Sequence, residues 1–274
     1  MKSIASWILL VGILSSFVTE DRYRQIKNDT FNKSEHIEYL VHYGMLTAGT
    51  ATVDVQPKIY TLNDRMCYRV DVVGKSAGFG GALVRIDDTW RTYMDTASFV
   101  SHRFYRHIEE GDYRREEVVD FSPLRNNAVL KYEEYGMKDD AKKPHTKGKK
   151  TFKTPDYAQD MISGYYFLRT IDFSKYKEGE IITISGVLED VVYSLQIRYK
   201  GKEEVKTKFG RIMAHRLAPI MPANQMFSGE NSIRFWVSDD KNRVPVRIEA
   251  DMFIGKVVCE MRDYSNLRYK MAFK

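Results

Sequence analysis

The sequence predicts a mostly β protein: a strongly curved antiparallel sheet, or an open or half barrel, with one principal helix packed on the concave side. Roughly fourteen segments alternate apolar and polar residues, which is typical of a sheet with one buried face. Short turns separate these segments, for example at 239–242. One segment, 155–170, has helical spacing instead. No period of about 20–50 residues repeats, so a propeller or solenoid is not expected.

The first 20 residues have the pattern of a secretory signal peptide. A short basic start precedes an almost wholly apolar stretch from Ile4 to Val18, and Glu20-Asp21 follows. This stretch is shorter than the about 18 apolar residues that span a bilayer comfortably. We expect cleavage within 16–21 and a periplasmic or secreted protein, with an uncleaved anchor as the alternative. No cysteine lies near the junction to carry a lipid, and no later segment predicts a transmembrane helix.

The rest of the chain has the composition of a folded protein. Hydrophobic residues make up 43% and charged residues 29% of the 274 residues, which excludes wholesale disorder. Residues 21–35 are polar and predict a loose lead-in. A single β-rich domain is expected over 36–270, where segments such as 191–199 and 244–252 alternate regularly.

Positive charge is concentrated in one segment. The formal net charge is +6, and residues 138–153 contain seven lysines and two aspartates. The remainder is therefore almost neutral, which is not typical of a nucleic-acid-binding face. We expect a solvated lysine-rich loop, and contact with an anionic polymer or an envelope protein is the functional alternative.

The helix is expected to begin at an N-cap, Thr154, followed by Pro155 in the first turn, and to end near Thr170. Its apolar stripe is broad and aromatic, and we expect it to cover the concave side of the sheet. The stripe consists of Ala158, Met161, Ile162, Tyr165, Tyr166, Leu168 and Arg169.

The two cysteines are expected to be separate thiols. The alternation predicts that Cys67 points outward and that Cys259 points inward, so a mutual disulfide is less favoured, although an oxidising compartment leaves it open. Two cysteines also cannot form a four-cysteine zinc site.

Catalytic motifs are weak. Gly74-Lys75-Ser76-Ala77-Gly78 matches the nucleophile pattern G-x-S-x-G, but a nucleophile elbow requires a helix directly after the serine. Here Phe79–Ala82 leads into another strand-like run, so we interpret the motif as a glycine-rich connection. Histidine spacing predicts no metal site, and neither a cofactor nor enzymatic activity is expected.

Asp88 is the most unusual carboxylate. A period of two places it on the apolar face with Ile86 and Trp90, where an unpaired charge would cost several kcal/mol. It therefore needs a partner, and Arg169 on the helix is the candidate. We interpret Asp88 as a structural pin between helix and sheet, and a polar anchor inside a ligand cavity is the alternative.

Several phrases together resemble the bacterial exported family known as domain of unknown function 3108. They span about 36–265, and in order they are Tyr43–Ala51, Asp88-Thr89-Trp90 with Asp95, Asp160–Arg169, Phe235–Asp240, Arg243–Val246 and Gly255. The resemblance implies an exported, curved antiparallel structure with one principal helix, distantly similar to the half-barrels of periplasmic lipoprotein carriers. It implies no catalytic residues.

Three functions follow as hypotheses. The first is a non-enzymatic envelope protein that binds an apolar or amphipathic, lipid-like ligand between sheet and helix, with Asp88 or Arg169 orienting a head group. The candidate lining is Trp90, Phe104, Tyr165, Tyr166 and Phe235, although such aromatics can equally fill a core. The second is an interaction module in surface-polymer or outer-membrane assembly. The third, least favoured, is a serine hydrolase acting through Ser76.

Overall fold

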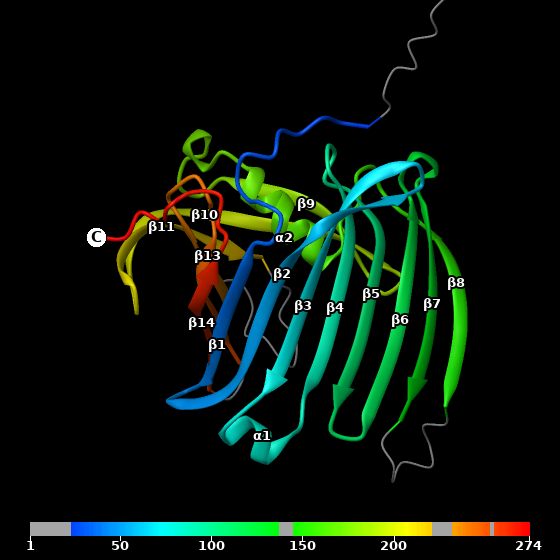
Figure 1. Cartoon of the computed structure of the whole chain (residues 1–274), viewed down its shortest axis with the longest axis horizontal. Helices are drawn as coiled ribbons and strands as arrows, with labels where there is room; N and C mark the ends of the chain where they lie inside the picture. The colour runs from blue at the N-terminus through cyan, green and yellow to red at the C-terminus, as the bar shows by residue number, and fades with distance from the viewer. Residues whose placement is uncertain (1–22, 137–144, 221–231, 253–254) are drawn as a thin grey trace, which may run out of the picture.

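The computed structural model describes residues 23–136, 145–220, 232–252 and 255–274 (Figure 1). The first seven strands are β1 (His36–Tyr43), β2 (Leu46–Leu62), β3 (Arg65–Ser76), β4 (Asp87–Asp95), β5 (Ser101–Glu110), β6 (Tyr113–Ser122) and β7 (Asn127–Tyr135). The other seven are β8 (Thr146–Lys153), β9 (Ile181–Leu188), β10 (Val191–Thr207), β11 (Gly210–Pro219), β12 (Ile233–Ser238), β13 (Pro245–Asp251) and β14 (Lys256–Ser265). The helices are α1 (Phe79–Leu83) and α2 (Met161–Thr170), with short 3-10 turns η1 (Pro123–Arg125) and η2 (Phe173–Lys175).

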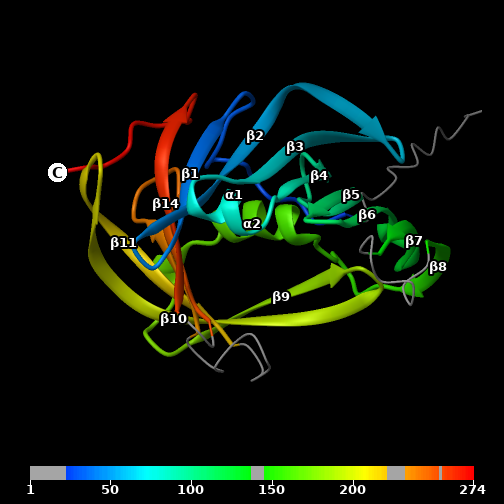
Figure 2. The same ribbon diagram turned by 90° about the horizontal axis from the view of Figure 1, so that it is seen from below.

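Within the described residues, fourteen strands form one antiparallel sheet with β8 and β9 at its edges. The sequence-adjacent strands pair as hairpins, and β1 pairs with β14 near the middle. The edges β8 and β9 do not pair with each other, so the sheet bends into a trough and is not closed into a barrel (Figures 1 and 2). The predicted fold class, a curved antiparallel sheet with a helix on its concave side, is confirmed.

The two ends of the trough differ. The α1 end, at the bottom of Figure 1, carries α1 and the β1–β2 turn. Because consecutive strands are antiparallel, the β5–β6 and β13–β14 turns lie at this end as well. The β9–β10 turn instead lies against β5 and β8, where Glu189 and Asp190 form ion pairs. Helix α2 lies across the concave side nearer the opposite end, which we call the α2 end (Figure 1).

Helix α2 is shorter than predicted, and its N-cap is Asp160 and not Thr154. The Asp160 carboxylate accepts hydrogen bonds from the backbone of Ile162 and Ser163, both at 2.8 Å, and the Ser163 hydroxyl completes a capping box. Residues 154–160 are not helical: a turn lies at Asp156-Tyr157, and Gln159 then pairs in parallel with Gly186 of β9. The pairing of Gln159 with β9 thus takes the place of the first helical turns that Thr154-Pro155 predicted.

The predicted lead-in is more ordered than its polar composition indicates. Residues 1–22, including the predicted signal peptide, lie outside the described residues, but 23–35 packs against the sheet. Phe31 is fully buried and contacts Phe99 and Tyr166 edge-on. The prediction of a loose segment was wrong because one aromatic side chain reaches the core and fixes its neighbours.

The lysine-rich segment is only partly the loop that was predicted. Residues 137–144 lie outside the described residues, whereas Thr146–Lys153 forms β8, which pairs with β7. β8 is an edge strand, and lysines on an edge discourage pairing with other chains. Its lysines therefore have a structural explanation that the composition alone did not indicate.

Both cysteines are free thiols, as expected, and the register places Cys67 on the face of β3 opposite the concave one, as predicted, but it is not exposed there. Its side chain is completely buried, whereas Cys259 is half-buried on the concave face. Burial raises the pKa of the Cys67 thiol to about 12 and that of Cys259 to about 11.

We predict that both thiols react slowly in the folded protein. At pH 8, with the pKa values of Cys67 and Cys259 raised to about 12 and about 11, almost no thiolate is present. A chromogenic disulfide reagent should titrate two thiols per chain in denaturant without reductant, and react far more slowly before unfolding. Fewer than two thiols in the denatured, unreduced protein would show that the cysteines are bridged.

Candidate functional site

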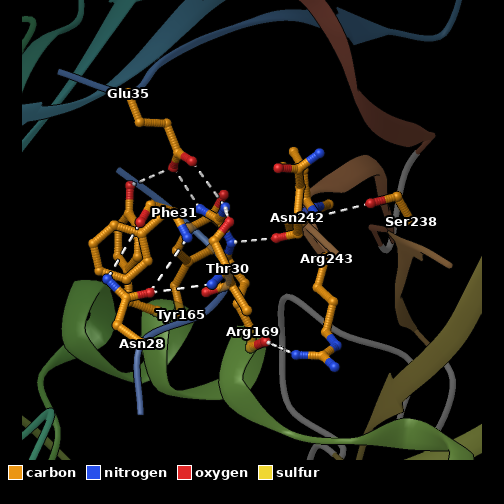
Figure 3. Close-up of polar contacts among 12 residues, drawn as sticks. Asn28, Thr30, Phe31, Glu35, Tyr165, Arg169, Ser238, Asn242 and Arg243 are labelled. Carbon is orange, nitrogen blue, oxygen red and sulfur yellow. Dashed lines mark hydrogen bonds and ion pairs between the residues drawn. The ribbon is translucent and has the colours of Figure 1, made fainter. Parts of the chain in front are cut away.

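A fully buried ion pair joins α2 to the segment before β1 (Figure 3). Arg169 donates two hydrogen bonds to the Glu35 carboxylate, at 2.5 and 2.9 Å, and both side chains are almost completely excluded from water. Two further Arg169 donors reach the backbone carbonyls of Thr30 at 3.3 Å and Asn242 at 3.1 Å. Four of the five guanidinium N–H donors are thus engaged and the group is excluded from water, so it cannot orient the head group of a ligand.

A group of tyrosines surrounds this pair. Tyr166 donates to Glu35 at 3.1 Å, and Tyr39 donates to the carbonyl of Pro245 at 2.9 Å. Tyr39 and Tyr165 approach each other at 3.5 Å between their hydroxyl oxygens. Burial raises the pKa of Tyr39 and Tyr166 well above the usual value, so both remain neutral hydrogen-bonding groups.

Two of the predicted lining residues belong to the core and not to a cavity. Tyr166 is 0% exposed and Phe104 2% exposed, and both pack within the main hydrophobic cluster. Side chains therefore fill the helix–sheet interface at these positions, which agrees with the alternative interpretation that the aromatic residues form a core. A ligand could not lie there without displacing Tyr166 or Phe104.

The other three predicted lining residues, Trp90, Tyr165 and Phe235, are half-buried. The Thr92 hydroxyl donates a hydrogen bond at 2.5 Å to Asp160, the N-cap of α2, so Thr92 faces the concave side. Side chains two positions apart in a strand point to the same face, so Trp90 also lies on the concave face. Directly paired residues share a face, which extends this surface across the sheet. Ten of its half-buried members are Val41, Ala51, Val72, Trp90, Leu195, Phe235, Ile248, Ala250, Val257 and Cys259.

We call these ten residues the apolar wall. They come from strands on both sides of the β1–β14 pair and lie beside α2. Sequence reasoning found only Trp90 and Phe235 of them, because the aliphatic members look like ordinary strand residues until the register shows that they share one face.

Asp88 is not paired with Arg169, and that prediction was wrong. It is 3% exposed and accepts a hydrogen bond from the backbone of Glu109 at 2.9 Å, so it joins the start of β4 to the end of β5. Burial raises its pKa, because the charged carboxylate loses solvation and has no cation beside it. Arg169 instead pairs with Glu35, which lies in the lead-in, where the sequence pattern indicated no buried residue.

A network of charged residues joins the two halves of the trough near the sheet edges. Arg106 donates to Glu117 and to Glu189 of the β9–β10 turn, both at 2.8 Å, and Arg115 also binds Glu117 at 2.9 Å. Lys150 of β8 reaches Asp190 in the same turn at 2.9 Å. Side chains thus bridge the opening that the backbone leaves between β8 and β9. We call this network the seam.

The seam retains unused hydrogen-bonding capacity. The buried Nε of Arg106 and the buried Oε1 of Glu117 have no hydrogen-bond partner among the described residues. Arg106 is paired directly with Trp90 of the apolar wall. A guanidinium beside an apolar surface is suited to an oxygen of an amphipathic molecule.

The remaining carboxylates of the resemblance motifs act as caps. Asp95 accepts from the backbone of Ala97 and Ser98, both at 2.8 Å, and Asp240 accepts from the backbone of Asn242 at 3.0 Å. Together with Asp160, they terminate turns or begin a helix. Their recurrence in the motifs has a structural explanation.

The Ser76 motif has a different setting from the one predicted. The short helix α1, and not a strand, follows Gly78, and the Ser76 hydroxyl accepts a hydrogen bond from the backbone of Ile86 at 2.9 Å. No hydrogen bond joins Ser76 to a histidine within the described residues. In those same residues, no group of three or more potential ligands is placed to hold a metal ion.

Exposed apolar side chains gather at the α1 end. Five of the twelve large exposed hydrophobic residues within 23–136, 145–220, 232–252 and 255–274 lie there: Tyr43, Met45, Leu46, Val84 and Tyr135. Met45, at the tip of the β1–β2 turn, is 99% exposed. None of the helices in the described part of the chain has the length and apolar character to cross a bilayer.

Comparison with known proteins identifies a family and a fold. The profile of a family described as "Protein of unknown function (DUF3108)" matches residues 38–262. No curated protein matches. A beta-barrel-like protein of domain of unknown function DUF1849 from Brucella abortus aligns with a TM-score of 0.53 and 9% identity, over 88% of this chain and 100% of that one. A protein with YmcC-like fold from Bacteroides fragilis aligns with a TM-score of 0.35 and 8% identity, over 88% and 99% of the two chains. The similarity to the Brucella protein shows the barrel-like fold alone.

We predict that breaking the buried ion pair is more costly than removing it. Arg169→Met leaves Glu35 charged and buried, and should lower the free energy of unfolding by about 3–5 kcal/mol. The double variant Glu35→Leu/Arg169→Met should recover much of this loss. Lys175→Met is the control, because that lysine side chain is 77% exposed. Urea denaturation measures all four proteins, and equal stability of Arg169→Met and wild type would contradict the assignment.

We also predict an acid sensitivity that depends on Asp95. Burial alone would raise its pKa, but His102, Arg65 and the backbone N–H groups of Ala97 and Ser98 outweigh burial and hold the pKa far below its usual value. The folded-state pKa is thus below the unfolded value of about 3.9. The resulting stability is present above that value and is lost as the pH falls from about 5 toward the folded-state pKa.

Asp95→Asn should therefore reduce stability at pH 7 by about 2–3 kcal/mol and flatten the decline between about pH 5 and pH 2. Asp112→Asn, at an exposed aspartate, is the matched control. Denaturation curves across this pH range provide the measurement. An unchanged acid profile in Asp95→Asn would show that another group controls the decline.

Proposed function

The chain belongs to the DUF3108 family of proteins of unknown function, and we propose that this member is an exported, non-enzymatic envelope protein that binds a lipid-like amphipathic ligand on its concave face. The observation that carries the proposal is the apolar wall: ten half-buried apolar residues that share one concave surface beside α2. Monomeric proteins seldom leave such a contiguous apolar surface without a use.

The ligand position differs from the one that the sequence predicted. Tyr166, Phe104 and the Arg169–Glu35 pair fill the space between helix and sheet, so the hydrocarbon would lie on the apolar wall beside α2. Burial would supply roughly 25 cal/mol per Å² of apolar area. The exposed apolar residues at the α1 end would offer the path by which such a molecule reaches the wall.

The seam supplies the polar contact for the ligand. The Arg106 side chain is 13% exposed and lies next to Trp90, so an oxygen of the ligand can pair with the guanidinium while the hydrocarbon contacts the indole. Asp88 lies on the same face, one alternate position from Trp90. Arg106 thereby takes the role that the sequence pattern predicted for Arg169.

The absence of an enzymatic role is also part of the proposal. The motif carboxylates Asp95, Asp160 and Asp240 are engaged as caps, and Ser76 is bonded to the backbone. A fluorophosphonate probe should therefore not label Ser76. Labelling that disappears in Ser76→Ala would favour a hydrolase instead.

Interaction with a surface polymer through the lysine-rich segment is the second candidate. The edge position of β8 explains its lysines without a partner, so this candidate has less support than the apolar wall. Changing Lys147 and Lys149, both exposed, to serine would remove charge while leaving β8 in place. Loss of partner capture with intact ligand binding would favour this alternative.

We predict that a brominated fatty acid quenches Trp90 and not Trp236. Trp90 lies on the concave face, whereas Trp236 pairs with Arg216 and Arg247 on the convex face. Dibromostearate should quench the fluorescence of Trp236→Phe strongly and that of Trp90→Phe weakly. Equal quenching in both variants would contradict a concave ligand site. The measurement uses protein without residues 1–20, so that Trp7 is absent and each variant retains one tryptophan.

A matched pair of variants tests the wall itself. Val72 faces the concave side and its neighbour Val73 the convex side of β3, and both are half-buried. Val72→Lys should weaken dibromostearate binding by at least about tenfold, since a charge then lies in the apolar surface. Val73→Lys should bind like wild type. Native mass spectrometry after gentle purification should also show a co-purifying lipid, and failure of both tests would refute the proposal.

A further inference from the structure

A second pocket lies apart from the apolar wall. Its volume is about 130 Å³, and its lining combines β1, β13 and β14 with the β10–β11 turn. Three of the lining residues, Leu40, Glu260 and Arg247, are paired directly across β1, β14 and β13. Their neighbours along each strand face the concave side, so these three side chains project on the convex side. The turn at Lys206–Lys208 closes the other side of the pocket.

The β10–β11 hairpin can reach this position because it extends past β12. β11 pairs with β12 only through Ala214–Leu217, so the part of the hairpin nearer Gly210 is free of that neighbour. The free part is anchored instead by the C-terminal segment: the backbones of Arg211 and Lys274 exchange hydrogen bonds at 2.8 and 3.3 Å. The pocket is therefore held between two fixed walls.

The charge of the lining is strongly positive. Lys206, Lys208, Arg247 and Arg262 line the pocket together with one carboxylate, Glu260. Arg247 is neutralised by Glu249 and Glu260, and Arg262 lies 3.4 Å from Glu38. Within the described part of the chain, Lys206 and Lys208 have no carboxylate partner. Two lysines without an ion pair thus line one small pocket, and Lys208 Nζ lies 4.8 Å from the centroid of the Phe209 ring.

The floor of the pocket is apolar. Leu40, Val246 and Met261 form it, and the last two are almost completely buried. A small hydrated anion would gain nothing from such a floor, whereas an anion with a short hydrocarbon substituent would bury apolar area there. We propose that this convex pocket binds an organic phosphate monoester, with the phosphate between Lys206 and Lys208 and its hydrocarbon on the floor.

Phosphate is favoured because its two negative charges match the two ammonium groups, and lysine recognises phosphate as a point charge. The pocket shares β1, β13 and β14 with the apolar wall, but Leu40, Arg247 and Glu260 project from the opposite face of these strands. A substitution in the wall on β3, away from the pocket, therefore tests the two sites separately.

Isothermal titration of the purified protein with hexyl phosphate, inorganic phosphate and hexanol tests the site. Hexyl phosphate should bind more tightly than either fragment, and its binding should weaken with added salt. Lys206→Gln/Lys208→Gln should reduce the affinity by about tenfold. The control Lys175→Gln/Lys177→Gln removes the same charge from exposed positions and should bind like wild type.

Three results would overturn the proposal: no binding of hexyl phosphate to wild type, equal binding by the Lys206→Gln/Lys208→Gln variant, or equal affinity for hexyl and inorganic phosphate. Val72→Lys should leave the hexyl phosphate affinity unchanged. A loss in that variant would assign the binding to the concave face and also refute the convex site.

Discussion

The ion pair of Glu35 and Arg169 determines how much of the concave face the helix covers. Both side chains are buried, and each charge offsets the desolvation free energy of the other. Removing either one would leave the other charge buried without a partner. Glu35 directly precedes β1 and Arg169 lies in the last turn of α2, so the pair ties the helix to the middle of the sheet. The helix is thereby held over one part of the trough, and the apolar wall beside it is left half-buried.

An antiparallel sheet that does not close must protect two edges and one concave surface. Here β8 carries lysines, β9 receives the parallel pairing of Gln159, and the seam joins the β9–β10 turn to β5, β6 and β8. These devices leave a trough with an apolar side and a charged side. That polarity, together with the guanidinium of Arg106 beside Trp90, is why an amphipathic ligand fits the site better than a purely apolar one.

Local patterns in the sequence were sufficient to predict the fold, and tertiary contacts explain what they missed. Alternation identified the strands, and aromatic spacing identified α2. The start of α2 was misplaced because Gln159 pairs with β9, a contact between distant segments. The partner of Arg169 was missed for the same reason: Glu35 lies in a segment whose polar composition hides its burial. Phe104 and Tyr166 show that an aromatic stripe does not distinguish a filled core from a ligand surface.

The account depends most on where a hydrocarbon chain contacts this protein, and intermolecular nuclear Overhauser effects measure that directly. With methyl-labelled protein and myristoyl lysophosphatidylcholine, the account predicts contacts from the acyl chain to the methyl groups of Val41, Val72 and Ile248, which share the concave wall. Contacts confined to convex methyl groups such as those of Val73, or no contacts at saturating lipid, would contradict it.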